Sequence, residues 1–375
     1  MGKPTAQRVL VVDDTAIYRK ILSRVVSPLP DVAHVETAPR GAIALDKLGR
    51  QHFDVVLLDV QMPDMDGMET LEKIREAHPD VAVVMVSAAT EKGSETAIRA
   101  LNLGALDLIE KPHGQTMDEN ITHLRGDLLS VLRVVETRRL ARQIRRRAAG
   151  GGGAPSTSVV AEPALTPRRP HLRVVETVPG NFSILAIGSS TGGPEALSQV
   201  IPRLPGNLPV PVVIVQHMPP VFTDALAKDL NRKSELDVKE AAEEDAVTRG
   251  KVLIAPGGRH LVLRERDDRL EVKLDDGPAE NSCKPSVDVL FRSVAETHSR
   301  RGVLSLIMTG MGADGRNGVE ALKRGRCYSL SQSAETCVVY GMPAAVDEAG
   351  LSDESLDLEE IAPRIVELVG RGTER

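Results

Sequence analysis

The feature that most constrains the fold is a series of short apolar runs that alternate with amphipathic stretches. Near the N-terminus the apolar runs are Val9–Val12, Val55–Leu58 and Val81–Val86. Runs this short and this apolar predict strands buried on both faces, as in a parallel sheet. The stretches Ile17–Val26 and Met68–Ala77 have the periodicity of amphipathic helices. The alternation predicts a doubly wound α/β domain, of the flavodoxin-like kind, over about the first 125 residues.

A second series of the same kind begins at Phe182. Its predicted strands are Ser183–Ile187, Val210–Gln216, Val252–Ile254 and Val303–Met308. Its predicted helices are Glu195–Pro202, Phe222–Asn231, Ser286–Thr297 and Gly318–Arg324. Two strand-like segments, His260–Arg264 and Leu270–Leu274, flank a turn-like sequence and predict a β-hairpin. We therefore expect a second, Rossmann-like α/β domain that also carries a hairpin.

The segment between the two series has a different character. A predicted helix, Met117–Arg147, is followed by Gly150–Gly153 and then by a Pro-, Ser- and Thr-rich stretch to Gly180. Such composition is typical of a flexible linker. The expected domains are therefore residues 1–128, a helical extension and linker at 129–180, and residues 181–375. The helix ends in arginines that could bind an acidic partner or nucleic acid, but a solvated helix terminus is the favoured interpretation.

Composition narrows the class of protein. The 375 residues are 41% hydrophobic and 27% charged, as in soluble globular domains, and only 2% aromatic, so the cores must be aliphatic. A net charge of −6 gives no indication of nucleic-acid binding by the whole chain. Three cysteines without a CxxC pair indicate a reducing compartment. No signal peptide or apolar stretch of membrane-spanning length is evident, so we expect a cytoplasmic protein without membrane insertion.

Polar residues follow the predicted strands of the first domain. Asp13 and Asp14 come directly after the first strand, and Asp59 follows the strand Val55–Leu58. The carboxyl ends of parallel strands share one edge of a sheet, so these carboxylates should meet there and would repel each other without a cation. Oxygen ligands at this charge density suit Mg²⁺.

Two further residues at the same edge suggest phosphoryl chemistry. Ser87 follows the predicted strand Val81–Val86, and Lys111 follows a further predicted strand near Leu106–Ile109. A hydroxyl with an ammonium can hold phosphoryl oxygens. Asp59 is the best candidate for a nucleophilic carboxylate because the other elements flank it. A pair of aspartates after a strand could equally cap a helix. The convergence of five suitable residues on the ends of four strands favours the phosphoryl site.

The first domain resembles the receiver domain of bacterial two-component response regulators. The resemblance rests on VLVVDDTAIYRK, DVVLLDVQMPDMDG, VVMVSAAT and DLIEKP, and covers roughly residues 7–125. It implies that a histidine kinase phosphorylates Asp59, and that Ser87 and Lys111 contact the phosphoryl group. It also implies Mg²⁺ held by Asp14, Asp59 and the backbone carbonyl of Gln61, with Asp13 acting largely through water. Receivers often have an aromatic switch residue three positions before the lysine, where this chain has Leu108.

Three residues of the second domain suggest nucleophilic catalysis. The sequence GSSTGGP joins a predicted strand to a helix and satisfies G-x-S-x-G around Ser190. His217 follows the next predicted strand and could serve as its base, and Asp314 follows another strand and could orient that base. Each has a simpler alternative, since Gly/Ser turns, buried histidines and helix-capping aspartates are common.

A dinucleotide site is the competing interpretation of the last segment. Gly310, Gly312 and Gly315 satisfy G-x-G-x-x-G, and Glu335 lies about twenty residues further on. However, this loop follows a late strand of its domain rather than the first one, and Asp314 within it would repel a pyrophosphate. A bare match to this motif is weak support.

The second domain resembles the catalytic domain of the chemotaxis protein-glutamate methylesterases. The matching stretches are ILAIGSSTGGPEAL, VIVQHMPPVFT, LIAPGGRHL, KPSVDVLF, LIMTGMGADG and CVVYGMP, over about residues 182–370. The resemblance implies a nucleophile at Ser190, a base at His217 and an orienting acid at Asp314. It also implies hydrolysis of glutamate methyl esters, and deamidation of glutamines, on methyl-accepting chemoreceptors, without a cofactor for that reaction. A chemotaxis histidine kinase would be the phosphodonor, and phosphorylation would uncover the active site.

Two other classes of function remain to be compared with this one. A response regulator with a DNA-binding output would need a helix-turn-helix or similar module, whereas residues 182–375 alternate strand and helix. An adaptor built on a degenerate hydrolase fold would act by binding alone. The presence of Ser190, His217 and Asp314 argues against the adaptor, and a hydrolysis assay separates the two.

Overall fold

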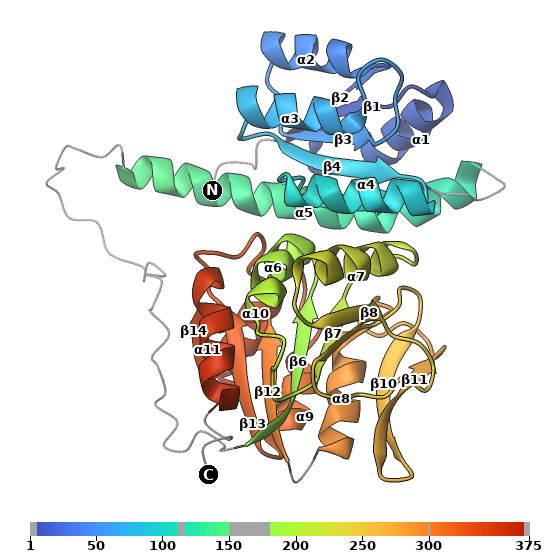
Figure 1. Ribbon diagram of the computed structural model, residues 1–375. Helices are drawn as coiled ribbons and strands as arrows, with labels where there is room; N and C mark the ends of the chain where they lie inside the picture. The colour runs from blue at the N-terminus through green and yellow to red at the C-terminus, as the bar shows by residue number, and fades with distance from the viewer. Residues whose placement is uncertain (1–5, 112–116, 150–180, 299–300, 371–375) are drawn as a thin grey trace, which may run out of the picture.

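The computed structural model describes residues 6–111, 117–149, 181–298 and 301–370 as two α/β domains, one above the other in Figure 1. The predicted linker lies outside the described residues, and so do the side chains of the arginines beyond residue 139. The domain boundary expected at residue 128 falls inside one continuous helix, Met117–Ala149. None of the helices in the described ranges combines the length and the apolar character needed to cross a bilayer.

The N-terminal domain is a five-stranded parallel sheet in the order β2-β1-β3-β4-β5, which is the flavodoxin-like order. Its strands are β1 (Gln7–Val12), β2 (Val32–Ala38), β3 (Val55–Asp59), β4 (Ala82–Ser87) and β5 (Asp107–Glu110). Its helices are α1 (Ala16–Val26), α2 (Gly41–Arg50), α3 (Gly67–Ala77), α4 (Glu91–Asn102) and α5 (Met117–Ala149).

Alternation along each strand sends side chains to two separate apolar cores. In β1, Val9 and Val11 pack with residues of α1 and α5, whereas Leu10 and Val12 pack with residues of α2, α3 and α4. Both faces of the sheet are therefore covered by helices. This explains why the strands of this domain are continuous apolar runs.

The C-terminal domain is a seven-stranded parallel sheet in the order β14-β13-β12-β6-β7-β9-β8. Its strands are β6 (Phe182–Ser189), β7 (Val212–Gln216), β8 (Asp237–Glu240), β9 (Lys251–Ile254), β12 (Gly302–Ile307), β13 (Cys327–Gln332) and β14 (Glu354–Leu356). The predicted hairpin is confirmed as the antiparallel pair β10 (His260–Arg266) and β11 (Arg269–Asp275). The helices are α6 (Gly193–Val200), α7 (Phe222–Lys233), α8 (Val287–Thr297), α9 (Arg316–Lys323), α10 (Met342–Glu348) and α11 (Leu358–Gly370). The predicted doubly wound fold class is thus confirmed for both domains.

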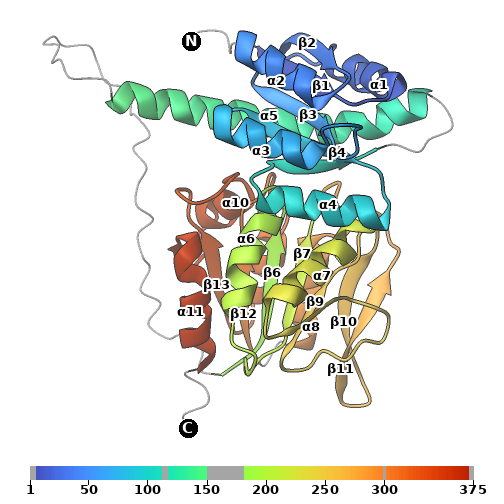
Figure 2. The same ribbon diagram turned by 45° about the horizontal axis from the view of Figure 1, so that its top comes forward.

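The N-terminal domain contacts the C-terminal domain through α4 and β5. Figures 1 and 2 show α4 lying along α6 and α7, at the end of the second sheet where β6 and β7 terminate. The amide of Asn102 donates to the carboxylate of Asp229 at 3.1 Å, and Lys228 donates to Glu91 at 3.1 Å. One apolar cluster continues from the first domain into the second. The N-terminal domain is therefore packed directly against the carboxyl edge of the second sheet.

We predict that Gly67→Ala destabilises the N-terminal domain by about 2 kcal/mol. A Cβ at this position would lie 2.2 Å from the carbonyl oxygen of Asp59 and 2.8 Å from Cα of Val60, and neither backbone atom can move cheaply. Gly49→Ala is the matched control, because its Cβ would meet no atom within 4 Å and alanine is the better helix former. Denaturant unfolding of both variants measures the difference. Equal stabilities would contradict the close approach at Gly67.

Candidate active site

A sharp turn after β6 places Ser190 at the carboxyl edge of the second sheet. Gly192 has a φ of +77°, which favours glycine, and a Cβ there would lie 2.5 Å from Cβ of Val338. A Cβ at Gly193 would lie 2.0 Å from Oε1 of Gln216. The two glycines of the GSSTGGP sequence are therefore needed for the close approach of neighbouring loops, and the turn leaves Ser190 half-buried at the rim.

His217 occupies the corresponding position after the adjacent strand. Ser189 and Gln216 are partners in the register of β6 and β7, and the backbone N–H of His217 donates to the carbonyl of Ser189 at 3.1 Å. Ser190 and His217 therefore stand beside each other at the ends of two paired strands. The side chain of Gln216 donates to the carbonyl of Ser190 at 2.9 Å, which fixes the turn from the β7 side.

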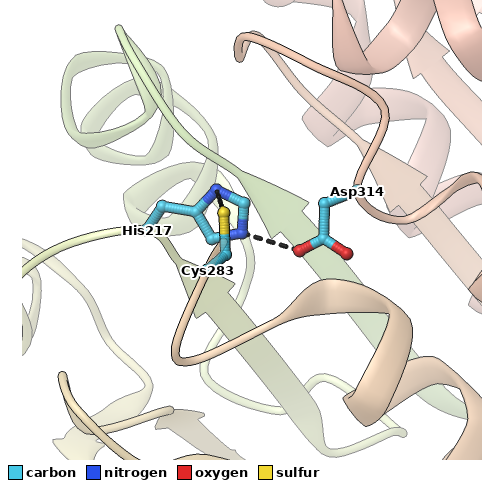
Figure 3. A group of neighbouring side chains, drawn as sticks. All are labelled: His217, Cys283 and Asp314. Atoms are coloured by element: carbon cyan, nitrogen blue, oxygen red, sulfur yellow. Dashed lines mark hydrogen bonds and ion pairs between the residues drawn. The ribbon is translucent and has the colours of Figure 1, made fainter. Parts of the chain in front are cut away.

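Asp314, the residue predicted to orient the base, lies on the loop between β12 and α9. Its carboxylate is 2% exposed and accepts a hydrogen bond from Nε2 of His217 at 2.8 Å (Figure 3). It accepts five more, from the side chains of Asn281 and Ser286 and from the backbone N–H groups of Val287, Asp288 and Gly315. Burial alone would raise its pKa, but His217 and these amides outweigh burial and lower the pKa to about 2. The carboxylate is therefore ionised at any pH where the protein would work.

The imidazole of His217 is held as a strong base. Burial disfavours its charged form, but the hydrogen bond with Asp314 and the neighbouring Cys283 outweigh burial and raise its pKa to about 9. An ionised carboxylate can only accept, so Nε2 carries a proton and Nδ1 is the nitrogen that can act as a base. Sγ of Cys283 lies 3.5 Å from that Nδ1 (Figure 3). Within the described residues, the hydroxyl of Ser190 makes no hydrogen bond with the imidazole, whose two nitrogens face Asp314 and Cys283.

Three residues of this site were not singled out by the sequence. Asp288, at the start of α8, accepts hydrogen bonds from the backbone N–H groups of Gly315 and Gly318 and thereby secures the loop of Asp314. The amide of Asn281 bridges the carboxylates of Asp288 and Asp314, at 3.0 Å from each. Cys283 and Asn281 lie on the loop before α8, just ahead of the sequence KPSVD, whose last residue is Asp288. The KPSVD sequence was the signal that could have identified Asp288, because an aspartate in the first turn of a helix is common and is no signal by itself.

The glycine-rich loop after β12 serves packing at this site. A Cβ at Gly310 would lie 2.8 Å from Cβ of Ser190, and one at Gly315 would lie 2.7 Å from Ile307. The carboxylate of Asp314 points from this loop to His217. The match to the dinucleotide motif is therefore explained by the close packing of β6, β12 and α8.

The acidic residues of the N-terminal domain meet as expected. Oxygens of Asp13, Asp14 and Asp59 lie within 4.8 Å of one another at the carboxyl edge of the first sheet. Nζ of Lys111 lies 2.8 Å from a carboxylate oxygen of Asp13 and 2.8 Å from one of Asp59, with the ring of Tyr18 beside it at 4.6 Å. The ammonium therefore contacts two of the three carboxylates.

The pKa of the Asp59 carboxyl reflects its burial and the charges around it. Burial raises the pKa of its carboxyl to about 6, against the lowering effect of Lys111, and the charge of Asp13 raises it further. Its carboxylate accepts a hydrogen bond from the backbone N–H of Gln61 at 3.3 Å. Ser87 ends β4, one strand away, with its hydroxyl buried. An uncompensated carboxylate cluster of this kind fits a divalent cation with oxygen ligands.

The N-terminal domain covers the loops next to Ser190. The hydroxyl of Thr191 donates to the carboxylate of Asp107 in β5 at 2.7 Å. Burial raises the pKa of Asp107 to about 6, despite this hydrogen bond. Met311, Val338 and Val339 of the C-terminal domain pack against the apolar cluster formed by α1, α5 and the strands they cover. The sequence offered no sign of these contacts, because they join distant parts of two domains.

Two family models match this chain. Residues 185–365 match "CheB methylesterase", and residues 9–122 match "Response regulator receiver domain". A solved structure of the Thermotoga maritima CheB methylesterase catalytic domain is 42% identical and covers 50% of this chain and 100% of its own length, with a TM-score of 0.49.

Curated relatives match along almost the whole length. A protein-glutamate methylesterase/protein-glutamine glutaminase of Desulfotalea psychrophila is 41% identical over 365 residues, 96% of this chain and 98% of that protein. The protein of the same name from Bacillus subtilis is 40% identical over 363 residues, again 96% and 98% of the two chains. Both the identity and the coverage include the N-terminal domain as well as the C-terminal one. The chain therefore belongs to the protein-glutamate methylesterase/protein-glutamine glutaminase family, with a response regulator receiver domain at its N-terminus.

Proposed function

We propose that this chain hydrolyses glutamate methyl esters and deamidates glutamines on methyl-accepting chemoreceptors, and that phosphorylation of its receiver domain increases the rate. The observation that carries the proposal is the buried His217–Asp314 pair at the strand end beside Ser190. An oriented imidazole next to a rim serine is the arrangement that acyl transfer requires. The names of the full-length relatives supply the substrate class.

In the first half-reaction, Ser190 Oγ attacks the ester carbonyl carbon while Nδ1 of His217 accepts the hydroxyl proton. Asp314 stabilises the resulting imidazolium and keeps Nε2 protonated. Backbone N–H groups at Thr191 or in the loop of Met311 are the candidates for binding the oxyanion. The imidazolium then protonates the departing methoxide, and methanol leaves an acyl-serine.

In the second half-reaction, His217 removes a proton from water, which attacks the acyl-serine and releases the glutamate carboxylate and Ser190. A glutamine side chain follows the same course with ammonia as the leaving group. The proton passes from Ser190 to the imidazole and then to the leaving group, so both half-reactions balance without a cofactor. The absence of a Ser190–imidazole hydrogen bond is compatible with this role, because such contacts often tighten only when substrate binds.

The receiver site would accept a phosphoryl group on Asp59 from a chemotaxis histidine kinase. Asp13, Asp14, Asp59 and the backbone carbonyl of Gln61 would hold Mg²⁺, which neutralises charge during phosphoryl transfer. Ser87 and Lys111 would contact the phosphoryl oxygens. Burial, with a smaller contribution from the charge of Asp13, raises the pKa of Asp59, and this supports the assignment because a divalent cation would stabilise the ionised carboxylate.

The receiver would restrain the esterase through β5. This strand carries Asp107, which accepts from Thr191, and it leads directly into Lys111 at the phosphorylation site. A phosphoryl group on Asp59 would draw Lys111 and Ser87 toward its oxygens. This change would shift the population toward a state in which the contacts of β5 and α4 with the C-terminal domain are broken. Leu108, which stands where receivers often have an aromatic switch residue, is buried. The proposed switch acts through Asp107 and α4 and therefore needs no rotating aromatic ring.

The setting proposed for this activity is the cytoplasm, where the kinase and the cytoplasmic parts of chemoreceptors are accessible. The alternative with a DNA-binding output is less well supported, because the described residues of the C-terminal domain form a parallel sheet with its covering helices and one hairpin. The adaptor alternative predicts no hydrolysis. The methanol-release assay therefore distinguishes an adaptor from the proposed esterase.

Ser190→Ala should abolish methanol release from methylated chemoreceptor membranes, because the variant lacks the attacking oxygen. Ser183→Ala is the matched control, since Ser183 lies at the opposite end of β6 and its hydroxyl donates to the carbonyl of Gly302. The measurement is the rate of methanol release by equal amounts of folded protein. Full activity in Ser190→Ala would remove this serine from the mechanism.

The activity should rise with pH toward the His217 pKa of about 9, because only the neutral imidazole accepts the serine proton. Asp314→Asn removes the charge that raises this pKa, while burial remains and disfavours the imidazolium. The acidic limb of the kcat/KM profile should therefore move to lower pH, with Cys283 still opposing part of the shift, and kcat should fall by roughly four orders of magnitude. An unchanged limb would show that Asp314 does not set this pKa.

A small-molecule phosphodonor with Mg²⁺ should raise the esterase rate of the full-length chain, and Asp59→Asn should not respond. Asp107→Ala should raise the rate without a phosphodonor, because it removes the carboxylate that Thr191 contacts. Asp46→Ala, on the exposed face of α2, serves as the control and should behave like the parent protein. A rate that is independent of the phosphodonor in the parent protein would contradict the proposed regulation.

A further inference from the structure

The side of the catalytic imidazole that faces away from Asp314 is occupied by a thiol. Sγ of Cys283 lies 3.5 Å from Nδ1 of His217, and one ligand atom each of His217, Cys283 and Asp314 falls within 4.8 Å of the others (Figure 3). The proposed esterase mechanism gives this thiol no task. A thiol and an imidazole are, however, the two ligand types that Zn²⁺ and related soft cations prefer.

The distance between the two atoms matches that of two ligands on one metal ion. Bonds of about 2.3 Å to sulfur and about 2.0 Å to imidazole nitrogen, at a tetrahedral angle, place the ligand atoms about 3.5 Å apart. Sγ and Nδ1 are already 3.5 Å apart. Neither side chain would have to move appreciably to share an ion.

The other ring nitrogen of His217, Nε2, has the kind of hydrogen-bond partner found at zinc sites. Zinc-bound histidines commonly donate their other ring N–H to a carboxylate, which orients the ring and makes the ligating nitrogen more basic. Asp314 accepts from Nε2 at 2.8 Å and is itself held by amides at the start of α8. The ring therefore presents Nδ1 rigidly to the side where the thiol lies.

We propose that Cys283 Sγ and His217 Nδ1 form a binding site for Zn²⁺ or another thiophilic divalent cation, and that the bound ion inhibits the esterase. On binding, the thiol and Nδ1 of the imidazolium each lose a proton to solvent, sulfur and Nδ1 each donate an electron pair to the ion, and water completes the coordination. The weak contact between the thiol and the carbonyl of Asn281, at 3.5 Å, is given up. The inhibition rests on the proposed role of Nδ1 as the base, whereas the binding does not.

The ligand set separates this site from the receiver site. Mg²⁺ prefers oxygen ligands, so it should act at Asp13, Asp14 and Asp59 and leave Cys283 unoccupied. Zinc acting through the receiver site instead would inhibit in the same way whether or not Cys283 is present. The cysteine variants therefore distinguish the two routes.

The test titrates full-length protein with Cd²⁺ and follows the ultraviolet charge-transfer band of a cadmium–thiolate bond, alongside methanol release in micromolar Zn²⁺. The parent protein and Ser190→Ala should both develop the band, although only the parent has activity to lose. Zinc should lower the parent rate by an order of magnitude, reversibly on chelation. Cys283→Ser should lose the band and respond less than twofold to zinc, whereas Cys283→His should remain sensitive because imidazole is also a zinc ligand.

Cys337→Ser is the matched control for the other thiols and should keep both the band and the inhibition. A band that survives in Cys283→Ser, or zinc inhibition unchanged by that substitution, would overturn the site. His217→Ala should weaken cadmium binding, and unaltered affinity would also overturn it. Failure of the proposed function is recognised separately, since an inactive parent protein that still binds cadmium through Cys283 would refute the esterase and leave the metal site standing.

Discussion

The contact between His217 and Asp314 is the interaction on which the account of the site depends. A carboxylate can remain ionised at 2% exposure only because six hydrogen bonds reach it, several of them from amides at the start of α8. That carboxylate, together with Cys283, raises the pKa of His217 to about 9, and its hydrogen bond with Nε2 leaves Nδ1 as the other ring nitrogen. The amides of α8 therefore help to keep Asp314 ionised, and Asp314 keeps Nε2 of the imidazole protonated. Nδ1 is then the nitrogen that can exchange a proton with a neighbouring acid.

The same edge of the sheet is also where the receiver domain is bound. Thr191, the neighbour of Ser190, donates to Asp107 of β5, and Met311 packs against the apolar cluster of the receiver. The receiver thus packs against the carboxyl edge of the second sheet through α4 and β5, and β5 runs from Asp107 beside the serine loop to Lys111 at the proposed phosphorylation site. A covered site also gives a physical reason for the missing hydrogen bond between Ser190 and His217. The rim is packed against protein here, and in the proposed mechanism the Ser190–His217 hydrogen bond forms when substrate replaces the receiver.

The parts of this structure that were predictable from sequence are those encoded locally. Ser190, His217 and Asp314 each follow an apolar run, and parallel strands bring such positions to one edge whatever their separation along the chain. The edge strand β2 was not predicted, because half-exposed residues interrupt its apolar pattern, and α11 contains Pro363, which usually ends a helix. The contacts of Asn281 and Cys283 depend on a loop with left-handed residues, Asn281 and Ser282 among them, and the Asp107–Thr191 bond depends on domain packing. Neither of these leaves a periodic signal in the chain.

The most direct test of the account is covalent labelling of the full-length chain with a serine-directed fluorophosphonate, followed by mass spectrometry of the modified peptide. Such a reagent reacts with a serine only when an adjacent base activates it. The account predicts a single phosphonylated residue, Ser190, modified faster once a phosphodonor and Mg²⁺ are supplied, and scarcely modified when Asp314 is replaced by asparagine. Labelling elsewhere, or at a rate that neither the phosphodonor nor that substitution changes, would contradict an activated serine beneath a movable receiver domain.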